Sequence, residues 1–463
     1  MDRINPKEAS TIIKSLEAGV VPDIGLGHLL VGRKAEVDEL IRILENIENG
    51  DSDLRFWVGD FGSGKSFMLK TIENLALSKN FVASTIDLNP SRRFYASDRK
   101  AVNLYSSIIE NLKTKNARTG NVIELIIEEW ISSIFAKLSA DKGYESKDLM
   151  AGLYKDEVLG VILETLAKFK TVGLSYELGQ AICRYYEGFI SNDRILKLKA
   201  IRWIRGDITT KTEAKKDLGI NEIINDDNYF EAIKNLAEFF QEIGYAGFVI
   251  NFDEAVNLYK IPHSTTRERN YEKILNIYNE CKSNLAKGLF INFGATRKTV
   301  FDQSRGLSSY GALKGRLGSE ASMDSDFINT NKTVLALKVL TDEEIYTLLE
   351  NLVKIYNTHY KTEINFTSSE IVRYMEGQLN RPGADEFLTP RAVIKDFIEI
   401  LDIKRQNPDI EIIDLLAEKF GNVLPVSKDP DDLDDEIEII WQHLTIYYLG
   451  ICENLSIKKA GRP

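Results

Sequence analysis

The sequence predicts an α/β fold in which a parallel β-sheet is flanked by helices. Three observations predict it: short apolar runs alternate with amphipathic helical segments, a glycine-rich loop joins one of these runs to a helix, and a later apolar run ends in two adjacent carboxylates. Alternation of this kind is typical of βαβ units, whose strands are parallel. We expect strands near residues 55–58, 81–88, 247–252, 288–295 and 334–340.

The glycine-rich loop follows the first predicted strand and fits the pattern G-x-x-x-x-G-K-[ST]. Its residues are Gly59, Asp60, Phe61, Gly62, Ser63, Gly64, Lys65 and Ser66. Glycines let the backbone wrap closely around a phosphate, and the N–H groups that open the next helix face the anion. Lys65 would supply a charge to the β- and γ-phosphates, and Ser66 a hydroxyl to Mg²⁺. The loop therefore predicts a site for ATP and Mg²⁺.

Two carboxylates, Asp253 and Glu254, follow the predicted strand at 247–252. The carboxyl end of a parallel strand points towards the ligand in such sheets. Asp253 is therefore expected to hold Mg²⁺ through water, and Glu254 to polarise the attacking water as a general base. In AAA+ ATPases, which this arrangement resembles, the neighbouring strand ends in a polar residue that contacts the γ-phosphate or that water. Thr296 stands at this position.

Three arginines are candidates for neutralising charge on the γ-phosphate. Arg316 lies beyond the strand at 288–295 and is the preferred arginine finger, with Arg305 as the second choice. A finger reaches the nucleotide of a neighbouring subunit, so this interpretation predicts a homo-oligomer. Arg391 follows Pro390 at the start of a late predicted helix. We expect it to fold back on the phosphates from a lid. For each of the three, the alternative is an ordinary surface arginine.

The pattern of segments predicts three parts. Residues 1–340 would form the ATPase domain, with a helical insertion at about 119–245 between the second and third strands. Residues 341–422 would form a helical lid, and 423–463 an acidic linker with a final helix. Within the insertion, basic residues gather around a tryptophan: Lys197, Lys199, Arg202 and Arg205 near Trp203. This cluster could contact nucleic acid or a partner, or form a solvated helix face.

Composition excludes several classes of protein. The 463 residues carry a net charge of −11, which argues against a generally basic nucleic-acid binder. Three scattered cysteines argue against a disulfide framework or a zinc site and favour a reducing, cytoplasmic location. No apolar run approaches the roughly 20 residues that a membrane-spanning helix needs, so no membrane association is expected.

The segment before the loop, Val31-Gly32-Arg33, resembles the stretch that lies against the adenine in AAA+ and STAND ATPases, so Gly32 and Arg33 are expected at the nucleotide. Several segments together resemble one family, the ATP-binding proteins of bacterial BREX-type phage-defence systems (the BrxC/BrxD ATPase domain). The segments that carry the resemblance are 16–22, 31–33, 56–66, 251–254 and 388–391. The resemblance implies a P-loop αβα sandwich of AAA+ and ORC-like type, often encoded beside a helicase and acting on or near DNA.

The sequence thus predicts an ATPase that couples hydrolysis of Mg²⁺-bound ATP to conformational switching in a defence complex, with DNA or a helicase as a partner. One alternative is a STAND-type switch or scaffold, in which ATP binding drives assembly and hydrolysis is slow. A second is an ATP-dependent loader that binds DNA directly. Both alternatives use the same phosphate-binding loop.

Overall fold

The computed structural model describes residues 4–96, 98–169, 173–323, 329–381 and 389–421. The described chain forms two units. The sheet unit comprises Val21–Leu26 and Leu30–Thr341, and the helical unit comprises the other described residues. The expected acidic linker and final helix at 423–463 lie outside the described residues.

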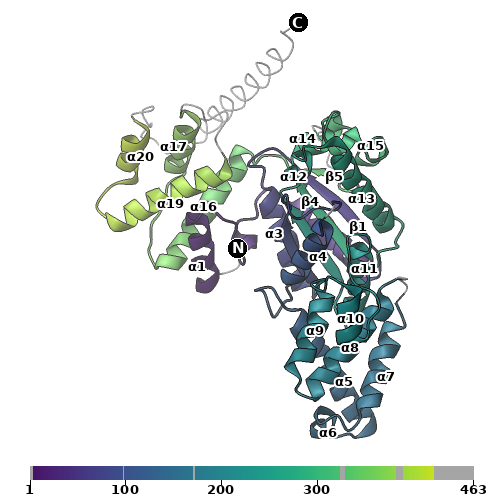
Figure 1. The fold of residues 1–463 in the computed structure, drawn as a ribbon. Helices are drawn as coiled ribbons and strands as arrows, with labels where there is room; N and C mark the ends of the chain where they lie inside the picture. Colours follow the sequence, from purple (N-terminus) through teal and green to yellow (C-terminus); the bar gives the residue numbers. More distant parts are fainter. Residues whose placement is uncertain (1–3, 97, 170–172, 324–328, 382–388, 422–463) are drawn as a thin grey trace. The chain divides into compact units, whose positions relative to one another are not determined.

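The sheet unit is built on five parallel strands in the order β2-β3-β4-β1-β5. Their bounds are β1 (Asp53–Val58), β2 (Val82–Asp87), β3 (Phe248–Asp253), β4 (Leu289–Ala295) and β5 (Val334–Ala336). The parallel sheet predicted from the alternating segments is therefore confirmed. The order places β4 between the strand that precedes the loop, β1, and the strand that ends in two carboxylates, β3. Figure 1 shows the sheet with β1, β4 and β5 labelled.

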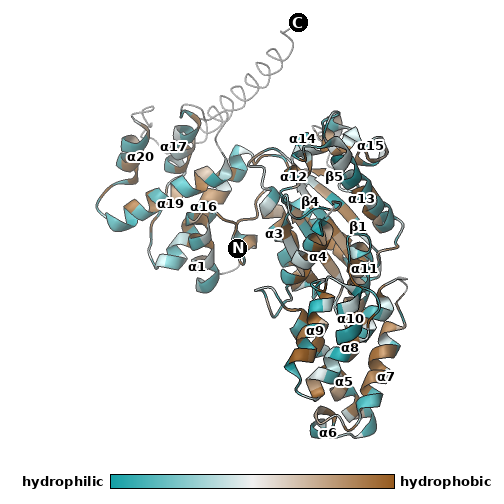
Figure 2. Ribbon diagram, in the orientation of Figure 1, coloured by the Kyte–Doolittle hydropathy of each residue, from teal (hydrophilic) through white to brown (hydrophobic). Residues whose placement is uncertain are grey.

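Helices cover both faces of the sheet, because alternate residues of each strand point to opposite faces. On one face, Trp57, Val249 and Phe290 pack in a cluster with α2 (Lys34–Glu48) and α3 (Lys65–Ser78). On the other face, Phe56, Ile250 and their neighbours pack in a cluster with further helices: α4 (Lys100–Glu110), α11 (Tyr229–Glu242) and α13 (Ser264–Lys282). The strands are mostly brown in Figure 2, as expected for strands buried on both faces.

Two asparagines inside the sheet are fully buried and hydrogen-bonded. Asn251 of β3 donates to the carbonyl of Leu69 in α3 at 3.0 Å, and Asn292 of β4 accepts from the indole N–H of Trp57 at 2.9 Å. A buried polar side chain is tolerated when such a partner is present. The contact of Asn251 also fixes α3, the helix that follows the loop, against the strand that ends in Asp253.

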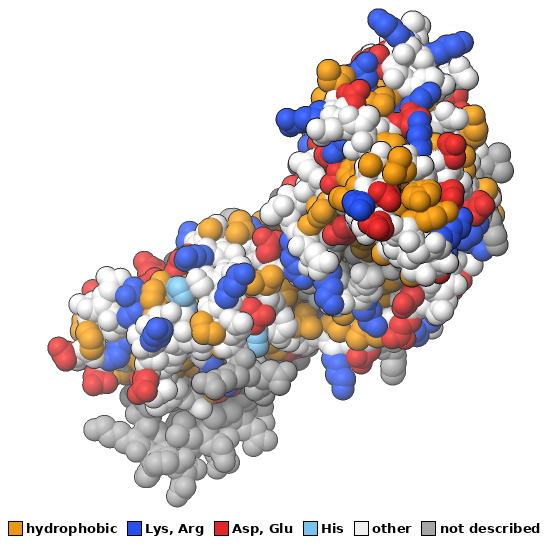
Figure 3. Space-filling view, turned by 90° about the horizontal axis from the view of Figure 1, so that it is seen from below, with side chains coloured by type: hydrophobic (Ala, Val, Ile, Leu, Met, Phe, Trp, Pro, Cys, Tyr) orange, Lys and Arg blue, Asp and Glu red, His pale blue; other side chains and the backbone are white. Residues whose placement is uncertain are grey.

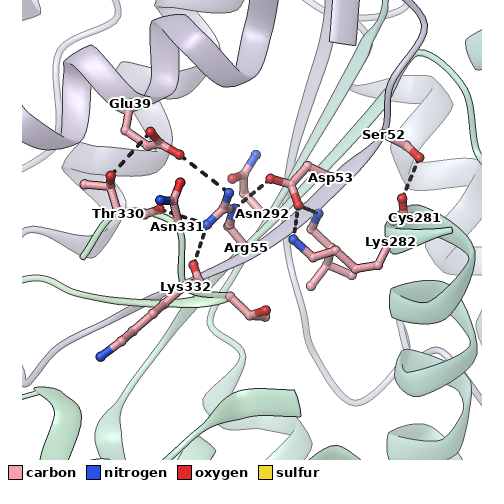
Figure 4. Close-up of polar contacts among 12 residues, drawn as sticks. Glu39, Ser52, Asp53, Arg55, Cys281, Lys282, Asn292, Thr330, Asn331 and Lys332 are labelled. Atoms are coloured by element: carbon pink, nitrogen blue, oxygen red, sulfur yellow. Dashed lines mark hydrogen bonds and ion pairs between the residues drawn. The ribbon is translucent and has the colours of Figure 1, made fainter. Parts of the chain in front are cut away.

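β5 is shorter than the run 334–340 that the apolar pattern predicts. It ends at Ala336 because the chain then leaves the sheet: the N–H of Leu337 still donates to the carbonyl of Val58, but the carbonyl of Lys338 accepts from Arg33, the residue before α2. Arg55 of β1 holds the segment just before β5, because its guanidinium donates to the carbonyls of Thr330 at 2.9 Å and Lys332 at 2.5 Å (Figure 4). The same guanidinium forms an ion pair with Glu39 at 3.6 Å.

The chain between β2 and β3, where the insertion is expected, is helical. Together with α11, the helices of this insertion are α5 (Ile123–Lys142), α6 (Ser146–Met150), α7 (Lys155–Leu166), α8 (Ser175–Ile190), α9 (Arg194–Ile204) and α10 (Lys211–Leu218). The basic cluster lies on and just after α9, and each of its four cations pairs with a carboxylate of a neighbouring segment. Basic and acidic side chains are also interspersed over the face seen in Figure 3. The cluster is therefore largely charge-compensated.

The remaining helices of the sheet unit are short and follow the strand ends. They are α12 (Val256–Tyr259) after β3, and α14 (Arg297–Phe301) and α15 (Gly311–Leu317) after β4. Their position brings polar side chains towards the carboxyl edge of the sheet. No helix among the described residues is long and apolar enough to cross a lipid bilayer.

The helical unit contains α1 (Pro6–Glu17), α16 (Asp342–Tyr360), α17 (Ser368–Leu379), α19 (Pro390–Gln406) and α20 (Ile412–Phe420). α1 packs on α16 and α19 and buries Ile12 and Ile13 completely. The hydroxyl of Tyr360 also bonds to Glu17 at 3.3 Å. Residues 4–20 therefore group with the C-terminal helices, whereas the sequence pattern assigned them to the ATPase domain.

Candidate nucleotide-binding site

The glycine-rich loop runs from the end of β1 to the start of α3. Gly62 and Gly64 both have φ of 87°, a left-handed backbone that glycine adopts without strain. α3 begins at Lys65, so its first N–H groups open onto the loop. Ser66 is exposed in this first turn, and Phe61 at the tip of the loop is 88% exposed. The loop is thus shaped to present backbone donors to an anion.

Gly59 is the point where the loop lies closest to the rest of the sheet unit. A Cβ at this position would lie 2.3 Å from the Ser63 hydroxyl and 2.6 Å from the carbonyl oxygen of Leu337. Ser63 is 3% exposed, and its hydroxyl has no hydrogen-bond partner among the described residues. A close backbone approach and a buried polar atom inside the loop both fit a cradle for a polar ligand.

Lys65 lies over the loop, and its ammonium donates to the carbonyls of Gly59 at 3.1 Å and Asp60 at 2.7 Å. Burial lowers the pKa of this ammonium, and the carboxylates of Asp253, Asp60 and Glu254 oppose the shift. An electrostatic effect of this kind requires the groups to be near one another. The lysine of the loop and the two carboxylates after β3 therefore share one site.

Asp253 and Glu254 lie at the end of β3. A Cβ on Gly294 of β4 would lie 2.9 Å from Oδ1 of Asp253, so the carboxylate extends over the neighbouring strand towards β1. Glu254 is exposed and has a left-handed φ of 54°, which is uncommon for a side chain of this size. Its N–H donates to the Asp253 carboxylate at 2.8 Å, and this bond stabilises the turn.

Thr296 caps the short helix α14 directly after β4. Its hydroxyl accepts from the N–H of Thr299 at 3.2 Å, so the side chain lies at the helix start with only part of its surface exposed. The next residue, Arg297, pairs with Asp60 of the loop, with 3.6 Å between Nε and Oδ2. Sequence reasoning missed Arg297; the available signal was its place directly after the polar residue that ends the strand.

Asp87 is a second residue that the sequence reasoning missed. It ends β2 and lies opposite Asp253 in the strand register. Burial and, after it, the charge of Asp253 raise the pKa of the Asp87 carboxyl. The edge of the sheet thus carries a carboxylate on β2 next to the pair on β3.

Arg33 is buried beside the loop, and its expected contact with the adenine stays a prediction. The residue is 9% exposed, and its guanidinium donates to the carbonyls of Ser63 at 3.2 Å and Lys338 at 2.5 Å and to Glu36 at 3.3 Å. The guanidinium therefore links the loop, at Ser63, to the segment that follows β5, at Lys338. Gly32, with φ of 68°, stays the residue through which the backbone of this segment can approach a base.

The three candidate arginines have different surroundings. Arg305 donates to the carbonyls of Tyr259 and Ile261 and lies over the Tyr259 ring, so it is committed within its own chain. Arg316 is exposed at the end of α15. Its guanidinium donates to the side-chain oxygen of Asn279 and to the carbonyl of Ala312. Arg391 is exposed in the first turn of α19, in the helical unit, and its sensor role stays a prediction.

A cavity of about 530 Å³ lies at the opposite, amino edge of the sheet. Its lining includes residues that precede four strands: Gly50 before β1, Asn80 before β2, Ala246 before β3 and Lys287 before β4. Acidic and basic side chains both contribute to it, including Glu242 and Lys168. The cavity is therefore separate from the edge that carries the loop and the carboxylates.

A parallel sheet with a phosphate-binding loop after one strand and carboxylates after another is compatible with a P-loop-like α/β sandwich. The family model described as BREX system ATP-binding protein BrxC/D matches residues 4–419. The chain belongs to this family of ATP-binding proteins, and the resemblance inferred from the motifs is thereby confirmed. No curated protein matches the sequence.

Proposed function

We propose that this chain binds ATP with Mg²⁺ and hydrolyses it, and that the cycle drives conformational switching within a BREX defence complex. The observation that supports this most directly is geometric: Lys65 and the pair Asp253 and Glu254 follow the carboxyl ends of parallel strands of one sheet, and the Asp253 carboxylate extends over β4, the strand between them. A lysine from the phosphate loop beside a carboxylate pair from another strand is the arrangement that phosphoryl transfer requires, because the catalysis consists of positioning and charge neutralisation.

Each residue has a separate task in the proposed reaction. The N–H groups of the loop and Lys65 hold the phosphates, and Lys65 exchanges its loop carbonyls for them. Ser66 and Asp253 would hold Mg²⁺, which would supply neutralising charge to the phosphate oxygens. Glu254 orients the attacking water and accepts its proton. Thr296, which follows the strand between the loop and the carboxylates, would contact that water or the terminal phosphate.

A hydrolysis assay with the purified full-length chain tests the proposal. The Lys65→Ala variant should lose tight ATP binding, whereas Glu254→Gln should bind ATP and fail to hydrolyse it. Normal turnover by Glu254→Gln would exclude this residue as the general base. Adding single- and double-stranded DNA, and measuring mass with and without ATP, tests for a nucleic-acid partner and for a homo-oligomer. Tight binding with very slow turnover in all conditions would instead favour a STAND-type switch.

A further inference from the structure

The end of β4 carries a cation that the proposed reaction does not yet use. Ala295 of β4 pairs with Val58 of β1, and the N–H of Gly59 donates to the Ala295 carbonyl at 3.2 Å. Asp60 and Arg297 each stand two residues beyond this paired position. Their side chains therefore meet at the carboxyl edge, between the loop and the strand that carries Asp253.

We propose that Arg297 reads the terminal phosphate of the nucleotide, and that Asp60 is the alternative partner that it leaves when a triphosphate binds. This inference rests on the proposed ATP site. It gives the loop residue Asp60 a function of its own: its carboxylate competes with the γ-phosphate for one guanidinium.

The strengths of the two contacts favour such an exchange. The carboxylate of Asp60 is 68% exposed and the Arg297 side chain 30% exposed, with 3.6 Å between their nearest charged atoms. Ion pairs as exposed as this one contribute little to stability. A guanidinium that contacts phosphate makes shorter, charge-assisted and often bidentate hydrogen bonds. The Asp60 contact itself therefore contributes little, and a phosphate offers the guanidinium the stronger contact.

The charges around the loop also favour the exchange of Arg297 from Asp60 to the γ-phosphate. Asp60, Asp253 and Glu254 all lie near Lys65. A triphosphate adds further negative charge beside them and repels the Asp60 carboxylate. Moving the guanidinium from Asp60 to the γ-phosphate reduces that repulsion. A diphosphate lacks the group that would complete the exchange, so Arg297 should affect ATP binding more than ADP binding.

Binding of ATP and ADP, measured in parallel on the full-length chain with Mg²⁺, tests the inference. Arg297→Ala should lower ATP affinity about tenfold or more, the range for one hydrogen bond to a charged group, and change ADP affinity much less. Asp60→Asn should raise the preference for ATP over ADP. Arg297→Lys, which keeps the charge, should fall between the wild-type protein and Arg297→Ala.

The matched control is Lys298→Ala, which removes a neighbouring exposed cation from the same helix. It should leave both affinities unchanged. Equal loss of ATP and ADP affinity in Arg297→Ala would assign Arg297 a structural role in the loop and overturn the inference. If the wild-type protein bound neither nucleotide, the proposed function itself would fail, and the two failures are distinguishable. Retained ADP binding by Arg297→Ala also shows that the variant is folded.

Discussion

The guanidinium of Arg33 donates to the carbonyl of Ser63 inside the phosphate loop, and the same group donates to Lys338 just beyond β5. Lys338 precedes α16, the first C-terminal helix of the helical unit. One buried side chain therefore joins the loop to the segment through which the chain leaves the sheet unit. A shift of the loop on nucleotide binding would therefore move the Arg33 guanidinium and, through it, change the position of Lys338.

Replacing Arg33 tests this support. Arg33→Ala leaves buried carbonyls without a donor, which costs roughly 1–3 kcal/mol, so both the melting temperature and ATP affinity should fall. Arg33→Lys should restore part of each, because an ammonium can satisfy one carbonyl. Lys34→Ala, at the exposed neighbouring position, is the control and should change neither. Unchanged ATP affinity in Arg33→Ala, measured by calorimetry, would show that the loop does not depend on this contact.

A methyl group at Gly59 should disrupt the loop. The added Cβ of Gly59→Ala would lie 2.6 Å from a backbone oxygen of Leu337, which cannot move aside as a flexible side chain would. Loss of ATP binding and a lower melting temperature are expected in thermal unfolding and binding assays. Gly315→Ala provides the comparison, because its Cβ would meet no atom within 4 Å. Wild-type ATP affinity in Gly59→Ala would contradict the tight packing described for the loop.

The left-handed backbone of Glu254 predicts a trade-off between stability and activity. A non-glycine residue in this region costs about 1–2 kcal/mol, and φ at Glu254 is 54°. Glu254→Gly should relieve this strain and Glu254→Gln should not, whereas both should stop hydrolysis. Differential scanning fluorimetry should therefore give a higher melting temperature for Glu254→Gly than for Glu254→Gln. The reverse order would show that the backbone at this position is not strained.

The pH dependence of Asp87→Asn should have a defined sign. The pKa of Asp87 is raised in the fold, first by burial and then by Asp253, so the ionised carboxyl costs stability at pH values above its folded pKa. Asp87→Asn should therefore be more thermostable than the wild type near pH 7 without nucleotide. The advantage should shrink as the pH falls through the raised pKa and protonates the wild-type carboxyl. A difference in melting temperature that is constant with pH would exclude this origin.

The packing of α1 can be tested by removing buried methylene groups. Ile12 is fully buried in the helical unit, and Ile12→Ala should cost about 2–5 kcal/mol there. Hydrogen exchange should rise in α16 and α19, while the strands of the sheet unit keep their protection. The exposed Lys7, on the same helix, provides the control Lys7→Ala. Faster exchange confined to β1 and β4 would instead place the first helix with the sheet unit.

Local patterns were sufficient to predict the strands, the parallel sheet and the phosphate loop. Each of these leaves a signal within a few residues: alternating segments for the sheet, and glycine spacing followed by Lys65 for the loop. The convergence of Lys65 with Asp253 also follows, because carboxyl ends of parallel strands meet at one edge. Predictions of this kind need only the strand direction and no side-chain detail.

The contacts of Arg33 could not be predicted in the same way. The carbonyl of Lys338, which accepts from Arg33, lies 305 residues further along the chain. No local pattern around either residue indicates that the two are in contact. The same holds for α1, whose amphipathic pattern shows that one face is buried but not that α16 covers it. Pairings across such distances are decided by tertiary packing.

The insertion between β2 and β3 has a consequence for how the chain folds during synthesis. Both strands that flank β1, namely β4 and β5, lie after the insertion in the chain. β1 therefore leaves the ribosome long before either neighbouring strand has been synthesised, so its hydrophobic side chains cannot yet pack in a complete sheet. The helices of the insertion make more local contacts, and we expect them to form first. The sheet closes late, and a nascent chain gains its complete phosphate loop only once Leu337 has been made.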